Sequence, residues 1–536
     1  MVRSIASVTA SGISSARDYA SRWRMTFWMV WALLLILKIA LAATLAPFGD
    51  EAWYWQESRA LDWSFSDLPL ATAALIRLGE TLFGHGVLAM RAPFLLLGAM
   101  VPLVLVQTGT RLFGVRDGWF TGLIALALPL LGTLGLFALP DVPLTLCAAL
   151  AFDAFERAAR TRSLPDWCAL GLALAAAWLS HYRAAMLLLA GLAFLLLTGR
   201  GRLLWRDRGL WVAVAISLLG LVPLLIFNLE HDWVALSFQV FERNPWAFHG
   251  DGLVQPLEQA IVCTPLFYLL LIWAAWRCVQ RCRAGAPWDL LAACSAVPWI
   301  AWFVLGCFAD DTRLRLHWPL QAYLPLLVAL PALLEPAHAV RGLRKSLSIA
   351  AFVVLAAGCV LTIAYFAAAA VPGGATSLAR FKAFPEHWVG WNEVAAETRG
   401  LLEEERFSDA TLVADNFMLA AELDFALAAA RPVYSLDHPI NTKHGRAPQL
   451  ALWRRDERAL RDLAAGRLLV VIEPTARRER ERAPWLDRVC STLKAPQVVG
   501  RLDLYGGRKR YLFVAADGLA DPTPAPVPGG ACSDFR

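Results

Sequence analysis

Residues 49–70, GDEAWYWQESRALDWSFSDLPL, place five acidic residues among three tryptophans and a tyrosine. This run follows an apolar stretch, residues 25–48, in a chain that is 58% hydrophobic and 18% charged. Soluble domains are nearer ~45–50% apolar and ~25% charged. The apolar residues are also grouped into runs of roughly the 20 residues that a helix needs to cross a bilayer. The sequence therefore predicts a polytopic α-helical membrane protein, with residues 49–70 at the membrane edge.

Apolar runs along the chain predict about eleven transmembrane helices. They are residues 25–48, 87–110, 118–138, 142–158, 166–180, 183–198, 209–228, 258–276, 288–307, 316–334 and 346–370. The first run exceeds the ~7–15 apolar residues of a signal peptide. It is therefore interpreted as an uncleaved helix that follows a cytoplasmic N-terminal segment, residues 1–24.

The charge of the connecting loops alternates. Cationic loops, which contain residues such as Arg111 and Arg157, alternate with acidic loops such as those of Asp141 and Asp232. The positive-inside rule places the cationic loops in the cytoplasm. An odd number of spans then places the acidic loops and the C-terminal part outside. Because the net charge of +6 is distributed in this way, it does not indicate a nucleic-acid partner.

The composition divides the chain into domains. Residues 25–370 form the predicted transmembrane domain, whose first outer loop is residues 48–86. Residues 371–518 have ordinary polarity, and helix-like runs alternate with apolar strand-like runs such as RLLVVIEP, which predicts an extracytoplasmic α/β domain. The Pro/Gly-rich tail, residues 519–536, is predicted to be disordered. Outside the cytoplasm Cys490 and Cys532 could form a disulfide or stay free, and the sequence leaves both open.

Carboxylates on the predicted outer face are the candidate chemical groups. The chain has no Walker A loop, HExxH, GxSxG or GxGxxG in a βαβ context, so no nucleotide cofactor is expected. Asp50 and Glu51 lie where the first helix leaves the membrane, and Asp67 follows in the same loop. Asp141 lies in the short loop LPDVPL between two spans, and acids at membrane depth tend to be functional. The structural alternative for Asp50 and Glu51 is solvation of a helix end.

Cationic and aromatic groups are predicted on the same face. They are Arg59, His181, Tyr182, Arg183, Arg243, Arg313, Arg315 and His317. Such cations suit a phosphate-bearing lipid donor, since they stabilise departing phosphate charge while a carboxylate accepts a proton from a hydroxyl. The structural alternatives are snorkelling of Arg183 at a helix end and an interfacial aromatic belt for Trp53, Trp55 and Trp63.

At this point the pattern resembles a known family. Residues 49–84 are similar to the first outer loop of the polyprenyl-phosphate-dependent GT-C glycosyltransferases, which include the lipid A aminoarabinose transferase and the protein O-mannosyltransferases. Further similar segments are LPDVPL, LSHYRAAMLL, IFNLEHDWVALSFQ, RLRLHWPLQAYLPLL, VADNFMLAAELDFAL and RPVYSLDHP. The resemblance covers most of the chain and is specific as a set, although each motif alone is weak.

The resemblance implies an inverting transfer of a sugar from a polyprenyl-phosphate carrier to a periplasmic acceptor. It implies a multi-pass protein of the bacterial inner membrane whose acceptor is lipid A or another envelope glycan. Asp50 takes the place of the catalytic acid, with Glu51 beside it, and the listed cations would bind the donor phosphate and sugar. Membrane lipids are the remaining expected partners.

The resemblance also associates a divalent metal ion with Asp67 and Asp141. Two carboxylates alone would be an incomplete site, because a catalytic zinc usually has three protein ligands; His181 and His231 are candidates for the third. The chain departs from the family at Leu68, where relatives carry His or Lys. His181 stands where relatives often have a Lys.

Other interpretations stay open at the level of sequence. A secondary transporter is also polytopic with ionisable residues at membrane depth, but it commonly has two related halves, and no repeat is visible here. A protein O-glycosyltransferase of the same superfamily and a non-catalytic scaffold that binds lipid-linked glycans are the further alternatives.

Overall fold

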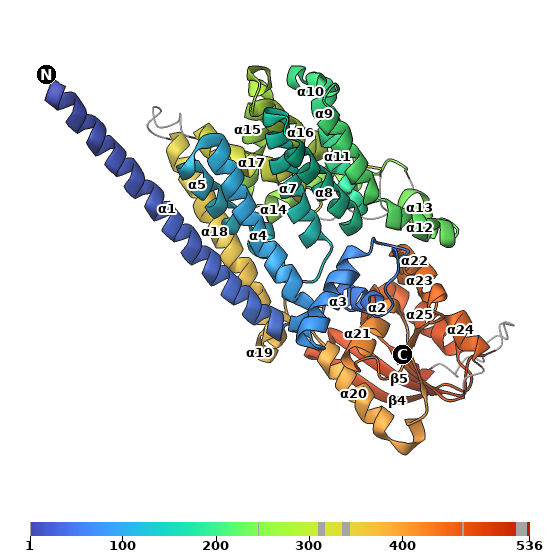
Figure 1. Cartoon of the computed structure of the whole chain (residues 1–536). Helices are drawn as coiled ribbons and strands as arrows, with labels where there is room; N and C mark the ends of the chain where they lie inside the picture. The colour runs from blue at the N-terminus through green and yellow to red at the C-terminus, as the bar shows by residue number, and fades with distance from the viewer. Residues whose placement is uncertain are drawn as a thin grey trace.

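The computed structural model describes residues 2–244, 246–308, 317–334, 343–463, 466–520 and 533–535. A bundle of helices leads into a C-terminal α/β domain, and the short helices α2 and α3 lie between the two parts (Figure 1). The predicted fold class, a membrane helical domain followed by an α/β domain, is confirmed.

Nineteen α-helices of the described residues precede the C-terminal domain. They are α1 (Val2–Thr44), α2 (Gly49–Arg59), α3 (Ala71–Phe83), α4 (Val87–Phe113), α5 (Val115–Ala127), α6 (Pro129–Gly132), α7 (Asp141–Thr161), α8 (Leu164–Ser180), α9 (Ala185–Leu197), α10 (Gly199–Leu204), α11 (Arg208–Leu219), α12 (Val222–Glu230), α13 (Val234–Ser237), α14 (Gln255–Val262), α15 (Pro265–Arg281), α16 (Trp288–Leu305), α17 (Leu320–Leu334), α18 (Leu343–Ala370) and α19 (Pro372–Leu378).

Five helices of the described chain are long and apolar enough to cross a membrane. They are Ser21–Thr44, Val87–Phe113, Arg208–Glu230, Trp288–Leu305 and Ser346–Ala370. A sixth span is possible if Gly250–Val262 and Pro265–Ala284, which are bent by 112°, form one broken span. Shorter apolar helices cover Leu164–Ser180, Tyr182–Leu197 and Leu320–Leu334. Each predicted span overlaps at least one helix of the described residues, but the count of eleven stays a prediction.

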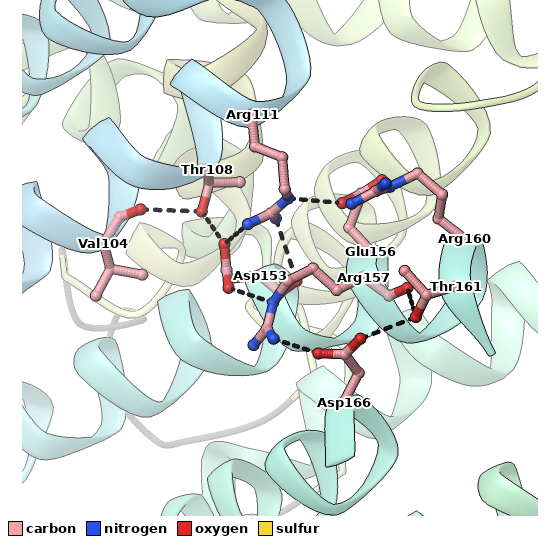
Figure 2. Close-up of polar contacts among 9 residues, drawn as sticks. All are labelled: Val104, Thr108, Arg111, Asp153, Glu156, Arg157, Arg160, Thr161 and Asp166. Carbon is pink, nitrogen blue, oxygen red and sulfur yellow. Dashed lines mark hydrogen bonds and ion pairs between the residues drawn. The ribbon is translucent and has the colours of Figure 1, made fainter. Parts of the chain in front are cut away.

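Ion pairs join α4, α7 and α8 at one end of the bundle (Figure 2). Asp153 of α7 accepts a hydrogen bond from Thr108 at 2.6 Å and pairs with Arg111 at 2.7 Å. Arg157 reaches Asp153 at 3.0 Å and also pairs with Asp166 of α8. From the sequence alone, Arg111 and Arg157 were interpreted as charges of the cytoplasmic loops. The structure shows that acids neutralise them, so that this network is a structural junction between helices.

The C-terminal domain contains a five-stranded sheet. Its elements are α20 (Trp391–Glu403), β1 (Thr411–Ala414), α21 (Phe417–Ala426), β2 (Val433–Ser435), α22 (Pro439–Lys443), α23 (Ala447–Leu452), α24 (Glu457–Asp462), β3 (Leu468–Ile472), α25 (Glu479–Thr492), β4 (Gln497–Leu504) and β5 (Lys509–Ala516). The strand order is β2-β1-β3-β5-β4. β1 is parallel to β2 and β3, whereas β5 is antiparallel to β3 and β4. All five residues of β3 are buried, as an apolar run between helices predicts. Cys490 is disulfide-bonded, while Cys532 lies outside the described residues.

Aromatic side chains of α2 dock the C-terminal domain. The Trp53 ring lies 5.4 Å from Phe417, and the Trp55 ring lies 5.2 Å from Phe425 of α21. Both tryptophans are fully buried, so they pack inside the protein and do not form an interfacial belt. Trp63 is half-exposed. The burial of α2 between the helices and the sheet domain fixes the position of the acids at its N-terminal end.

A buried carboxyl group after β1 makes the stability of the domain depend on pH. Asp415 is fully buried and accepts hydrogen bonds from Trp485 at 3.2 Å and from Asn416 at 2.7 Å. Burial raises the pKa of Asp415 from 3.8 to about 7. A carboxyl group whose pKa is raised in the folded state favours folding while it is protonated.

We expect the stability of the full chain to fall as the pH rises from about 4 to about 7, and Asp415→Asn to reduce this fall. Thermal unfolding of the detergent-solubilised protein between pH 4 and 8 measures the effect. Asp503→Asn, at an exposed surface ion pair, should leave the pH profile unchanged. If Asp415→Asn and the wild type lose stability equally as the pH rises, the pH dependence does not come from Asp415.

Candidate active site at the domain junction

The first turn of α2 carries two acids that face different surroundings. The helix begins at Gly49, so Asp50 and Glu51 lie near its N-terminal N–H groups, where the helix dipole favours negative charge. Asp50 lines a cavity, and its side chain is 26% exposed. Glu51 is fully buried and does not line that cavity. Of the two, Asp50 is therefore the carboxylate that a substrate can reach.

The cavity has a volume of about 180 Å³ and is built from segments that are far apart in the sequence. Its lining consists of Phe48, Asp50, Tyr54, Asp67, Leu68, Leu139, Pro140, Asp141, His181, Arg183, Phe238, Arg243, His317, Trp318, Lys443, His444 and Arg446. The structure thus brings together seven residues that the sequence singled out, namely Asp50, Asp67, Asp141, His181, Arg183, Arg243 and His317. Their convergence is what a single active site requires.

Asp141 is held by cations on one side of the cavity. Its Oδ1 atom lies 2.5 Å from Arg183 and 3.4 Å from Nε2 of His317. Burial alone would raise the pKa of Asp141, but Arg183 and His317 lower it below its ordinary value. The carboxylate is therefore ionised. The guanidinium groups of Arg183 and Arg243 lie over the Trp318 ring, at 5.4 and 5.1 Å, and this stacking orients them.

His181 differs from the lysine it was expected to replace. Its Nδ1 atom accepts a hydrogen bond from the backbone N–H of Arg183 at 3.1 Å, which leaves the ring proton on Nε2. Burial, together with Arg183, lowers the pKa of His181 well below its ordinary value. At neutral pH the imidazole is uncharged, so His181 can offer a hydrogen bond but not the positive charge of a lysine.

Arg446 occupies the opposite side of the cavity and was missed by the sequence analysis. It comes from the C-terminal domain, between α22 and α23, and pairs with Asp67. Its Nη2 atom also lies 3.3 Å from Asp50 and 3.4 Å from the Tyr54 hydroxyl. The absence of a cation at Leu68 was the one signal that another part of the chain must supply a partner for Asp67. Nothing in the sequence identified which arginine would do so.

Two other predicted site residues do not line the cavity. Arg59 pairs with Glu80 at 3.2 Å, and Tyr182 lies between the lining residues His181 and Arg183 in the sequence. Arg313 and Arg315 lie outside the described residues. His231 is 3.7 Å from Asp62, so it supplies no third ligand to Asp67 and Asp141.

The residues present do not fit the predicted metal ion. Among the described residues there is no cluster of three or more His, Cys, Asp or Glu that could hold one. Asp67 is bound by Arg446, and Asp141 is bound by Arg183 and His317. The two acids are thus engaged with cations of the chain, and they lack the third protein ligand that a catalytic zinc usually has.

A second cavity, of about 570 Å³, is apolar and lies among the helices of the bundle. It is lined by residues of α7, α8, α9, α11, α16 and α17. Three of these helices, α7, α9 and α17, begin at or just after residues that line the polar cavity. Met186 follows Arg183 by three residues, Gln321 follows Trp318 by three, and Ala148 follows Asp141 by two turns of α7. A long apolar group could therefore extend from the polar cavity between the helices.

Glu51 is predicted to be essential for stability. Its carboxylate pairs with buried Arg91 at 2.6 Å and accepts the backbone N–H of Ala138 at 2.6 Å. We expect Glu51→Gln to lower the free energy of unfolding by about 3–5 kcal/mol, because it leaves Arg91 as an uncompensated buried charge. The control is Asp62→Asn in the same loop, at an exposed site. Thermal unfolding in detergent measures the difference, and equal midpoints for both variants would refute this role.

Comparisons with known proteins agree with this architecture. Residues 67–227 match the model of the family described as dolichyl-phosphate-mannose-protein mannosyltransferase. A lipid A galacturonosyltransferase, RgtD of Rhizobium johnstonii, is 29% identical over 239 residues, which are 44% of this chain and 50% of that protein. The matched region thus spans half the length of this relative.

The solved structures of ArnT from Cupriavidus metallidurans are similar over nearly the whole chain. The complex with undecaprenyl phosphate has a TM-score of 0.65 at 18% identity and covers 92% of this chain and 98% of that one. The apo structure gives a TM-score of 0.64 with the same coverage. The chain therefore has the ArnT-like GT-C fold that the sequence predicted.

Proposed function

We propose that the protein is an inverting glycosyltransferase that moves a sugar from a polyprenyl-phosphate carrier to lipid A or another envelope glycan on the periplasmic side of the inner membrane. One observation carries the proposal. A polar cavity with three carboxylates and several cations lies at the N-terminal ends of α7, α9 and α17, and these three helices also line an apolar cavity. This arrangement suits a donor that has an anionic head and a long apolar tail.

The apolar cavity would receive the first part of the polyprenyl chain. Its lining is aliphatic and aromatic, with Gln321 and Ser217 among the few polar residues. Burial of this chain contributes roughly 25 cal/mol per Å² of apolar surface. The phosphate would then lie near Arg183 and Arg243 at the cavity floor. The solved relative with undecaprenyl phosphate bound has the same fold, which supports this orientation.

Asp50 is the best candidate for the general base. The side chains of Asp67 and Asp141 are 4% and 16% exposed, against 26% for Asp50, and both pair closely with arginines. In the proposed step the acceptor oxygen attacks the anomeric carbon. The bond from that carbon to the phosphate oxygen breaks, its electron pair stays on the phosphate, and the hydroxyl proton moves to Asp50. Attack opposite the leaving phosphate inverts the anomeric configuration.

The acceptor is the part of the proposal that depends most on the relatives. RgtD is a lipid A galacturonosyltransferase, which supports lipid A as the acceptor here. The family model is named for protein mannosyltransferases, so a protein acceptor is the competing outcome. Mass spectrometry of glycolipids from a deletion strain and its parent separates these outcomes. A sugar-sized mass difference in lipid A supports the proposal, and an unchanged glycolipid profile refutes it.

Asp50→Asn should reduce transfer by about 100-fold or more, because it removes the group that accepts the proton. The measurement is the fraction of modified glycolipid after complementation of the deletion strain, at matched protein levels. Asp62→Asn is the matched control, since Asp62 lies in the same loop but not in the cavity. Full activity of Asp50→Asn would show that another group performs this role.

A further inference from the structure

Arg446 is held in place before any substrate binds. The preceding residue, Gly445, has φ +72°, a left-handed conformation that favours glycine. A Cβ atom at Gly445 would also lie 2.5 Å from the Phe238 ring, so the backbone approaches the membrane domain closely here. The Ser66 hydroxyl donates a hydrogen bond to the Gly445 carbonyl at 2.6 Å, and the Ser66 backbone N–H donates one to Oε1 of Gln449 at 3.0 Å. Two contacts thus lock this turn to the residue next to Asp67.

Aromatic rings surround the guanidinium of Arg446. It lies 5.0 Å from the Trp53 ring, 5.1 Å from Tyr54 and 5.4 Å from Phe417. Rings from α2 and α21 therefore enclose the cation from both domains. Their faces attract positive charge, and a guanidinium excluded from water needs such partners.

The acids around Arg446 require a cation. Glu57, Asp50 and Asp67 lie within reach of its guanidinium, with Glu57 at 3.7 Å and Asp50 at 3.3 Å. Burial alone would lower the pKa of Arg446, but Asp67 and Tyr54 raise it above its ordinary value, so the guanidinium is charged. Burial raises the pKa of Asp67 and of Glu57, and the charge of Arg446 opposes this rise, so Arg446 favours the ionised form of the acids around it.

We infer that Arg446 is the resident cation of this acidic centre, a positioning residue that neutralises Asp67 and holds Asp50 for its role. It takes the place that the sequence analysis assigned to a divalent metal ion. This inference rests on the proposed function, and it makes the C-terminal domain a component of the active site. Two consequences follow: sugar transfer needs no divalent ion, and a small soluble cation can replace the side chain of Arg446.

The first test is chelation of the wild-type protein. Membranes from the complemented deletion strain contain the endogenous donor and acceptor, and product glycolipid is followed by mass spectrometry. We expect the rate to change less than about twofold after treatment with EDTA and 1,10-phenanthroline. A loss of about tenfold or more that added Zn²⁺ or Mg²⁺ reverses would overturn the inference. This test does not depend on the folding of any variant.

The second test replaces Arg446. Arg446→Ala should lower the rate about 100-fold, comparable to the loss of a preorganised electrostatic contact, and Arg446→Lys should retain more activity. Millimolar guanidinium should raise the rate of Arg446→Ala by about tenfold or more. A merely structural arginine would show no such rescue. A rate of Arg446→Ala near that of the wild type, or no response to guanidinium in a variant with normal thermal stability, would overturn the inference.

Arg455→Ala provides the matched control. Arg455 comes from the same domain and pairs with buried Asp424 at 2.6 Å, but it does not line the cavity. We expect the rate of sugar transfer by Arg455→Ala to be less than about threefold below that of the wild type, and guanidinium should not change it. If wild-type membranes form no product that the deletion strain lacks, the proposed function itself fails. If wild-type membranes form the product and Arg446→Ala forms it at the wild-type rate, the proposed function stands. Only the role of Arg446 is then rejected.

Discussion

Arginine–carboxylate pairs at the junction tie together segments that are distant in the sequence. Arg91 of α4 holds Glu51, Arg183 holds Asp141, and Arg446 of the C-terminal domain holds Asp67. A buried carboxylate is costly unless a charge partner and hydrogen bonds compensate it. The pairs therefore specify how the first outer loop, the helical bundle and the sheet domain meet. Asp50, at the N-terminal end of α2, is left more open to the cavity than the other acids.

The same junction separates two environments over a short distance. The polar cavity lies where the loops and the C-terminal domain meet, and the apolar cavity begins within a few residues along α9 and α17. In the proposed function, Asp50, the most open of the three carboxylates, would act on the head of a lipid whose tail stays in an apolar surrounding. The buried tryptophans of α2 keep this geometry rigid, because they fill the space between the bundle and α21.

Much of the candidate site could be predicted from local sequence. Asp50, Asp67, Asp141, Arg183 and His317 were singled out because each is a polar residue in a loop or at the edge of an apolar run, and all five line one cavity. The predictions were wrong where the residue that makes the contact comes from a distant segment of the chain. Trp53 and Trp55 were assigned to a membrane interface, but they are buried by α21. Glu51 was grouped with Asp50, although its contact with Arg91 turns it away from the cavity.

By itself the sequence determined the fold class, the division into a helical membrane part and an α/β domain, and the loops that carry the candidate site. These features depend on hydrophobic runs and periodicity, which are local properties of the chain. The tertiary structure alone decided which acids pair with which arginines, and that Arg446, 379 positions away from Asp67, enters the site. Electrostatic pairing acts through space at a few ångströms, so its partners become known only when the packing of the domains is known.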